Sequence, residues 1–399
     1  MENPMGRFID PTSDQEMQRR WDAVRAMMRE KKIDYLVMQN DEEFMGGSLR
    51  WFTDWTARHQ FPMTVIFPLH EDMTVINCGN EPPLPQGFPP RWGARGIKNN
   101  LGDVYFPTFG FSKYYDGKLA VDVLKEKPKA TIGWVEPSFI PMTFAEYLKE
   151  NLPNATFVDA TEWVDLLRAA KSEEEIAQTK VTASIHDACV EHLKAAIKPG
   201  MHDYDVYAET HYFMSKHGSG RGLVLVNSGP MGTFAPFDVY HLQGRVIQEG
   251  DQLSVLNETN GPGGLYAELF RVFCVGCEPD QELKEGWANA VECQHLIAKH
   301  MVPGASCKDL YTMAKDFMVE RGYSAPTRSF SHGQGYSLVE RPSLRLDEPW
   351  ELFAGMNVAV HPVLVKPGRL WIMCCDNYIV RDTNGAEKIH HSPQEIILL

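Results

Sequence analysis

The sequence predicts a mixed α/β protein that is divided into two domains near residue 168. Over the first 168 residues, short apolar runs typical of buried strands alternate with helical patterns. The second half contains an internal repeat, in which Pro303-Gly304 follows Pro199-Gly200 at a distance of 104 residues (303 − 199). We therefore expect a smaller α/β domain over residues 1–168 and a larger α/β domain with pseudo-two-fold symmetry over residues 169–399.

The N-terminal domain is predicted to begin with a helix and to continue as a sheet. Ser13 and Glu16 form a capping-box pattern. The apolar residues that follow fall on one helical stripe, at positions 17, 21, 24 and 28. Apolar runs predict strands over residues 34–40, 63–69, 73–79, 130–136 and 155–160, with a helix around residues 144–150 before the last of them.

The second domain is predicted to open with a long helix. Ser172 can cap this helix, the acidic run 173–175 suits its first turn, and the helical pattern continues to about Ile197. The 104-residue repeat also pairs Asp205 with Asp309, Tyr207 with Tyr311, Phe213 with Phe317, Met214 with Met318, and Gly218 with Gly322. Two similar halves that face each other would form a central cleft, where small molecules usually bind.

Composition narrows the class of protein. The 399 residues carry a formal net charge of −14, and an acidic surface repels nucleic acid. The N-terminal residues lack the pattern of a signal peptide and no apolar run has the length of a membrane span, so a cytoplasmic protein is expected. Eight cysteines are too few for a disulfide scaffold, and Cys274 and Cys277 are interpreted as small apolar strand residues.

Several motifs of the second domain resemble those of the creatinase/aminopeptidase P family, which includes prolidase. In chain order they are Asn227-Ser-Gly-Pro230, Asn257-x10-Glu268-x2-Arg271, His332-Gly-x-Gly335, Glu340-x-Pro342, the stretch from Gly355-Met356 to His361-Pro362, and Asp376 eight residues before Asn384. The resemblance implies a pita-bread catalytic domain behind a smaller α/β domain. It also implies a homodimer in which the partner's N-terminal domain covers the site.

The ligand positions of the family carry different residues here. Where its peptidases have Asp, Asp, His, Glu and Glu, this chain has Asn257, Glu268, His332, His361 and Asp376. A dinuclear centre needs several carboxylates to bridge two ions and offset their charge. The resemblance therefore predicts the scaffold of the family without its dinuclear metal centre.

Two hypotheses for the site follow from these residues. In the preferred one no metal is bound: His332 and His361 transfer protons, Glu268 and Asp376 provide electrostatic support, and Asn257 hydrogen-bonds the substrate. In the other, one divalent transition metal is held by two imidazoles and two carboxylates, from Glu268, His332, His361 and Asp376.

Further residues are candidates for substrate binding. His241 or Asp238 can take the place of a histidine in the family's cleft, with a surface loop as the alternative for His241. Glu340 and Tyr266 are expected in the cleft, and Trp371 is expected either as an apolar wall for the substrate or in the core. Arg58 and His59 lie in a segment that, by the resemblance, reaches the neighbouring site or the dimer interface. His390 and His391 are expected at the surface.

The preferred function is a hydrolase that cleaves an amidine-type or amide-type C–N bond in a small, polar, amino-acid-like metabolite, as creatinase does. A lyase with one metal is the runner-up, because one lyase on this fold acts on dimethylsulfoniopropionate. Such a lyase would yield an alkene without consuming water. Residual Xaa-Pro peptidase activity is a further alternative, and a non-enzymatic binding module is disfavoured by the cluster of ionisable residues.

Overall fold

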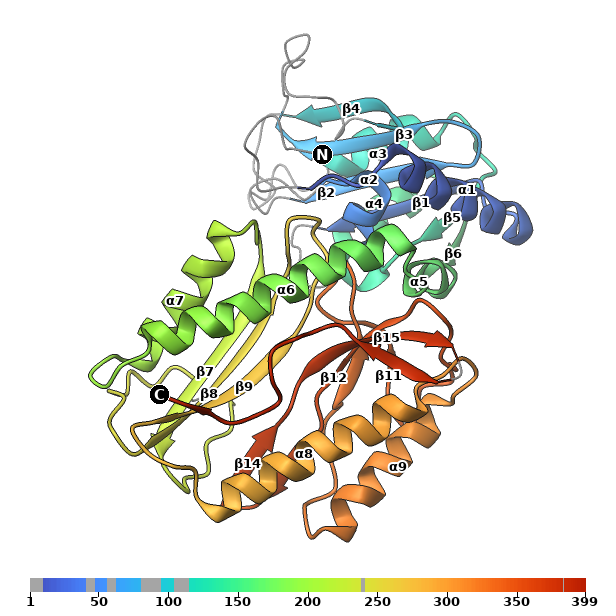
Figure 1. The fold of residues 1–399 in the computed structure, drawn as a ribbon. Helices are drawn as coiled ribbons and strands as arrows, with labels where there is room; N and C mark the ends of the chain where they lie inside the picture. The colour runs from blue at the N-terminus through green and yellow to red at the C-terminus, as the bar shows by residue number, and fades with distance from the viewer. Residues whose placement is uncertain are drawn as a thin grey trace. The chain divides into compact units, whose positions relative to one another are not determined.

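The structure, a computed structural model, describes residues 10–40, 47–55, 62–79, 95–103, 115–237, 241–382 and 384–399. The chain forms two compact units, Pro11–Arg168 and Ala169–Leu399 with Asp10. The division falls at the end of helix α5 (Thr161–Ala169). Helices and strands alternate in both units, which confirms the mixed α/β class (Figure 1).

The first unit contains one six-stranded sheet in the order β4-β3-β2-β1-β5-β6. Its strands are β1 (Tyr35–Asn40), β2 (Met63–Pro68), β3 (Met73–Cys78), β4 (Ile97–Asp103), β5 (Thr131–Trp134) and β6 (Thr156–Asp159). Its other helices are α1 (Asp14–Lys31), α2 (Gly47–Thr53), α3 (Tyr115–Leu124), η4 (Pro137–Phe139) and α4 (Met142–Asn151). Strands β1 and β2 are antiparallel, whereas β1, β5 and β6 are parallel because α3 and α4 cross between them.

The second unit is built from two halves that repeat the same helix arrangement. Helices α6 (Glu173–Ala196) and α7 (Asp203–Lys216) belong to one half, and α8 (Gln281–His300) and α9 (Cys307–Glu320) to the other (Figure 1). Helices α7 and α9 begin and end 104 residues apart (307 − 203 and 320 − 216), as the repeat predicts. The turns before them also match, because Gly200 has φ 95° and Gly304 has φ 86°, a conformation that favours glycine.

Each half supplies a sheet. The first has the order β17-β9-β8-β7, and the second has the order β11-β10-β12-β15-β16. The strands of the first sheet are β7 (Gly222–Pro230), β8 (Asp251–Thr259), β9 (Leu269–Val275) and β17 (Ile397–Leu398). Those of the second are β10 (Ser331–Gly333), β11 (Glu340–Ser343), β12 (Asn357–Val360), β15 (Asp376–Asp382) and β16 (Gly385–Lys388), and β13 (Val363–Lys366) pairs with β14 (Leu370–Met373).

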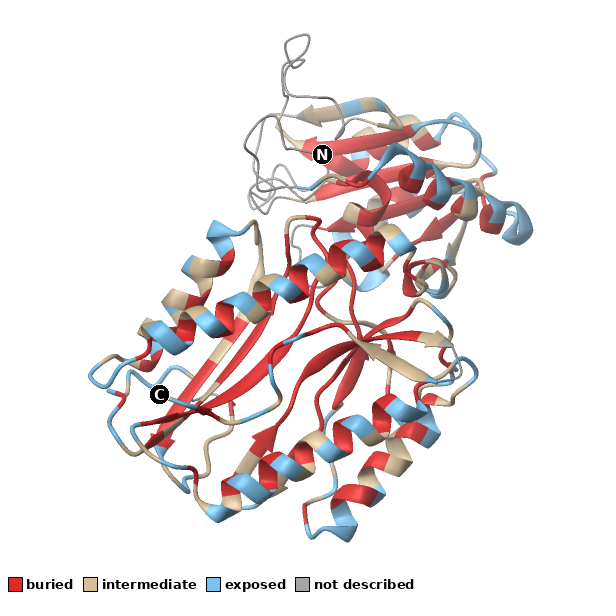
Figure 2. Ribbon diagram, viewed as in Figure 1, coloured by how far each residue is buried: buried red, intermediate tan, exposed pale blue. Residues whose placement is uncertain are grey.

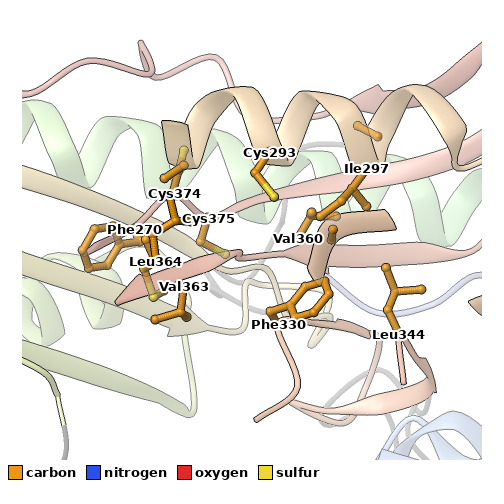
Figure 3. Packing of buried hydrophobic residues seen from close by; sticks show 14 of the residues in the cluster. Phe270, Cys293, Ile297, Phe330, Leu344, Val360, Val363, Leu364, Cys374 and Cys375 are labelled. Carbon is orange, nitrogen blue, oxygen red and sulfur yellow. The ribbon is translucent and has the colours of Figure 1, made fainter. Parts of the chain in front are cut away.

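The two sheets meet where Phe270 pairs with Cys375 in an isolated antiparallel bridge. The inner strands are buried along almost their whole length, whereas α6 and α8 alternate buried and exposed residues (Figure 2). Phe270, Phe330 and Val360 pack with Cys374 and Cys375 in the core at this junction (Figure 3). The junction therefore holds the ends of β9, β10, β12 and β15 in fixed positions.

No helix among the described residues is long and apolar enough to cross a membrane. All eight cysteines are free, and Cys274 is a buried residue of β9, as its apolar surroundings predict.

Candidate functional site

The hairpin of β8 and β9 places two glutamates side by side. In its antiparallel register Asn257 is opposite Leu269 and Asn260 is opposite Tyr266. Glu258 is therefore opposite Glu268, and cross-strand neighbours share one face of a sheet. Their carboxyl groups hydrogen-bond to each other, and both residues are buried, with exposed fractions of 4% and 3%.

Asn257 does not reach this site, contrary to the sequence-based prediction. Successive side chains of a strand point to opposite faces. The Asn257 Oδ1 accepts a hydrogen bond from Thr259 Oγ1 at 2.9 Å, and Thr259 lies against His186 of α6. The spacing of eleven residues assigned the first ligand position to Asn257. The register of the hairpin instead brings its neighbour, Glu258, to the site.

His332 and His361 come from two adjacent strands of the second sheet. His332 lies in β10 opposite Ala359 of β12, and His361 directly follows β12. The two imidazole rings are 5.1 Å apart at an angle of 62°. The His332 Nδ1 lies 3.0 Å from the carbonyl oxygen of Gly333, which can only accept, so Nδ1 carries a proton and Nε2 of the neutral ring has a free lone pair.

Glu268, His332 and His361 converge on one point. One ligand atom from each lies within 4.8 Å of the other two, and this is the one group of metal-binding type found in the described part of the chain. The His332 Nε2 lies 3.5 Å from Glu268 Oε2. Among the described residues, Glu268 Oε2 and His361 Nε2 are buried without a hydrogen-bond partner. Because such atoms are costly to bury alone, a ligand, ion or water is expected between them.

Burial and charge set the protonation of this group. Burial and the neighbouring charge of Glu268 raise the pKa of Glu258 well above its usual value. Burial lowers the pKa of His361 to about 4, although the negative charge of Glu268 opposes this shift. Burial therefore favours the uncharged form of both Glu258 and His361.

Asp376, which was expected in the site, lies outside this group. Its carboxylate accepts hydrogen bonds from Arg271 Nη2 at 2.9 Å and from Gln394 Nε2 at 2.8 Å. Although burial opposes ionisation, the Arg271 guanidinium holds the pKa of Asp376 below its usual value. Asp376 is thus part of a closed ion pair, and the predicted set of four ligands is reduced to three.

Three expected substrate-binding residues have structural partners instead. The carboxylate of Glu340 pairs with Lys171 Nζ at 2.6 Å. Tyr266 is 0% exposed, and its backbone N–H donates to the Gly335 carbonyl. Trp371 packs edge-on against Phe237 with ring centroids 5.1 Å apart, so it belongs to the core rather than to a substrate wall.

The remaining predicted residues divide into two groups. His241 is half-buried in a turn. Asp238, Arg58 and His59 lie outside the described residues. His390, expected at the surface, is instead buried with an exposed fraction of 1%, because it follows β16 into the interior of the second unit.

Glu258 was missed because the spacing of eleven residues before Glu268 assigned the ligand position to Asn257. The signal that could have found it is the alternation of β8, since an acid in an otherwise apolar strand is expensive unless it has a role. Gln334, the variable residue of the His-Gly-x-Gly motif, was also missed. Its Nε2 donates to Glu258 Oε1 at 2.7 Å.

The three converging residues fit one divalent ion and do not fit two. Two imidazole nitrogens and one carboxylate oxygen are a donor set typical of a catalytic zinc or iron site with an open position. A second ion would need further carboxylates. Asp376 is engaged by Arg271, and Asn257 points to the opposite face of the sheet.

Two family models match the sequence. The model of metallopeptidase family M24 matches residues 177–382, and the model of the creatinase/prolidase N-terminal domain matches residues 104–170. Among curated proteins, an uncharacterized peptidase of Bacillus subtilis is 29% identical over 271 residues, which cover 67% of this chain and 75% of that protein. A Xaa-Pro dipeptidase of Pyrococcus horikoshii is 24% identical over 267 residues, which cover 65% of this chain and 73% of that protein.

Solved structures share the fold over nearly the whole chain. A Xaa-Pro dipeptidase from Bacillus anthracis superimposes with a TM-score of 0.76 at 24% identity, covering 96% of this chain and 100% of the other. The His243Ala variant of Escherichia coli aminopeptidase P gives a TM-score of 0.73 and covers 96% of both chains. At these identities the structural likeness establishes the fold and leaves the chemistry to the site itself.

Proposed function

The chain belongs to metallopeptidase family M24, and on that premise we propose that it is a hydrolase that cleaves an amide-type C–N bond in a small, amino-acid-like substrate. The observation that carries the proposal is the convergence of Glu268, His332 and His361, with two of their polar atoms buried and unpartnered among the described residues. Such a cost in stability is expected at a binding site.

Glu268, His332 and His361 would hold one divalent ion. When bound, the ion would supply Lewis acidity and lower the pKa of a bound water. The family and this donor set support an ion over the metal-free site that the sequence favoured. The His332 tautomer suits the role, because its Nδ1 proton is held by the Gly333 carbonyl and its Nε2 is free to bind.

Glu258 is the residue that we assign to proton transfer. The raised pKa of its carboxyl favours the protonated form, and the carboxyl lies beside Glu268. A protonated carboxyl can give its proton to the departing nitrogen of an amide, which is a poor leaving group as an anion.

Arg328 supports a substrate with a carboxylate. It lies four residues before His332, is exposed, and has no hydrogen bond or ion pair among the described residues. Its charge acts on both Glu258 and His361. A free guanidinium beside a site in an acidic protein is suited to bind a carboxylate, as in a dipeptide or an amino-acid derivative.

The test combines metal analysis with a paired substrate panel. Purified protein is assayed for bound metal, stripped with chelator, and reloaded with Zn²⁺, Mn²⁺ or Fe²⁺. Each sample is then given Xaa-Pro dipeptides, their C-terminal amides and cyclic amidine or amide amino acids. We expect about one ion per chain, its loss in His361→Ala, and hydrolysis that depends on it. Arg328→Met should raise KM by about 10–100-fold for substrates with a free carboxylate and leave the amides unchanged.

The metal-free hydrolase is the second candidate, because the raised pKa of Glu258 suits a general acid and the lowered pKa of His361 suits a general base. Full activity after removal of the metal would favour it and would overturn the single-ion proposal. An alkene product formed without consumption of water would instead identify a lyase.

A further inference from the structure

We infer that Gln334 and Asn377 are positioning residues that set the geometry of the Glu258–Glu268 pair. The inference rests on the proposed function, since it concerns the same site. Neither residue contacts the converging point itself. Both are 0% exposed, and their amide groups form a continuous hydrogen-bonded chain that ends on the two glutamates.

The chain has four members. The Glu268 backbone N–H donates to Asn377 Oδ1 at 2.6 Å, and Asn377 Nδ2 donates to Gln334 Oε1 at 2.8 Å. Gln334 Nε2 then donates to Glu258 Oε1 at 2.7 Å. Asn377 thus ties the backbone of one glutamate to the side chain of the other, with Gln334 as the link.

The direction of every bond in this chain is fixed. A backbone N–H can only donate, so the atom of Asn377 that faces it is the oxygen and the other is the nitrogen. Gln334 must accept from that nitrogen with its oxygen, which turns its own N–H toward Glu258. Glu258 Oε1 therefore accepts from Gln334, and the Glu258 carboxyl also hydrogen-bonds to that of Glu268.

A buried histidine, His390, lies at the far end of the chain. His390 Nε2 lies 3.3 Å from Asn377 Oδ1, which can only accept, and His390 Nδ1 lies 3.4 Å from Asp187 Oδ1. Although burial opposes ionisation of Asp187, the hydrogen bond and charge of His390 lower its pKa to about 2. The backbone N–H groups of His391 and Ser392 also hold Asp187 in place.

The arrangement holds Glu268 between Glu258 and the histidines. Its carboxyl hydrogen-bonds to that of Glu258, which Gln334 holds in place. Its Oε2 lies 3.5 Å from His332 Nε2 and belongs to the group that converges with His361. Without Gln334 the Glu258 carboxyl would lose its donor and rotate, and Glu268 would no longer present a single fixed oxygen. Residues that orient metal ligands in this way typically change metal affinity or activity by about 10–100-fold.

The experiment compares Gln334→Leu with Gln39→Leu. Gln39 is a matched control, because it is a buried glutamine (2% exposed) whose Nε2 donates to the buried carboxylate of Asp116 at 2.6 Å, in the other unit. Zn²⁺ affinity is measured by competition with a chromophoric chelator, together with the melting temperature and, for the substrate found, kcat and KM. We expect both variants to lose stability, and only Gln334→Leu to lose about 10–100-fold in Zn²⁺ affinity and in kcat.

Equal Zn²⁺ affinity and equal kcat in the two variants would overturn the inference, because Gln334 would then be a structural residue only. Full recovery of kcat in the exchange variant E258Q/Q334E, which keeps the hydrogen bonds but moves the carboxyl away from Glu268, would instead contradict the proton-transfer role of Glu258. A wild-type protein that hydrolyses the substrate without binding Zn²⁺ contradicts the single-ion proposal instead, and kcat alone then decides the positioning role.

Discussion

Two buried acidic groups lie close together in the second unit, and they are balanced in opposite ways. Asp376 faces Arg271 and Gln394, and both of its oxygens are hydrogen-bonded. Glu258 and Glu268 face each other as two carboxyl groups without a counter-charge in contact, and Glu268 Oε2 has no hydrogen-bond partner among the described residues. In the sequence, Asp376 and Glu268 both occupy ligand positions of the same family.

The difference separates a structural charge from a functional one. A buried carboxylate with a complete set of partners stabilises its surroundings and has no free lone pair in a direction that a ligand could use. A buried carboxylate with a like-charged neighbour and a free oxygen is destabilising until something binds. Asp376 therefore has a structural role, whereas Glu258 and Glu268 belong to the functional site.

Replacement of the carboxyl group by an amide should lower the free energy of unfolding at Asp376 and raise it at Glu258. Asp376→Asn removes the counter-charge of Arg271, which is 1% exposed, and leaves a buried cation unpaired. We expect a loss of about 3–5 kcal/mol in the free energy of unfolding, measured by urea denaturation. A loss below about 1 kcal/mol would mean that Arg271 is neutralised by other partners.

The pH dependence of stability should arise from the site rather than from the ion pair. The pKa of His361 is lowered from the usual 6.5 to about 4 in the folded protein. The unfolded chain therefore takes up a proton first as pH falls. The stability contribution is complete above about pH 6.5 and is lost progressively down to about pH 4.

We compare wild type with His361→Gln after chelator treatment, by urea denaturation at each pH. Between about pH 7 and pH 4, the free energy of unfolding of wild type should fall by about 3 kcal/mol more than that of the variant. Equal losses in the two proteins would show that His361 is protonated at an ordinary pKa.

The smallest change in the free energy of unfolding is expected for Glu258→Gln, and this change is a gain rather than a loss. Glu258→Gln replaces the acid beside Glu268 by an amide that can still accept from Gln334 and can donate to Glu268. We expect the metal-free protein to gain about 1 kcal/mol in the free energy of unfolding, as replacement of a strained functional group commonly does. The turnover rate should fall by about 10²–10⁴-fold, since the proton donor is gone. A Glu258→Gln variant that is both destabilised and active would show that Glu258, like Asp376, has a structural role.

The sequence was sufficient for most of the fold because the fold depends on local pattern. Apolar runs located the strands of the first unit, and Ser172 does form a capping box with Glu175 at the start of α6. The repeat was visible because paired turns need glycine at equivalent positions, as Gly218 (φ 98°) and Gly322 (φ 78°) illustrate.

The site was only partly predictable because it depends on register and on distant partners. Glu268, His332 and His361 were identified from motifs and do converge. Asp376 was misassigned because its partner Arg271 is 105 residues away in sequence. His390 was misassigned because a polar residue near the end of a chain is usually exposed, whereas this one lies beside Asn377 and Asp187.

The turn between β8 and β9 carries an evolutionary consequence. Strand pairing fixes which residue of β8 is opposite Glu268, and a slip of one residue turns every side chain to the other face. A single codon inserted in this turn would withdraw the acid at position 258 and offer the amide at 257 in its place, with no substitution anywhere. Descendants of one ancestral hydrolase can therefore exchange proton-donating and neutral sites through loop length alone, and a column-by-column comparison of their sequences would not register the change.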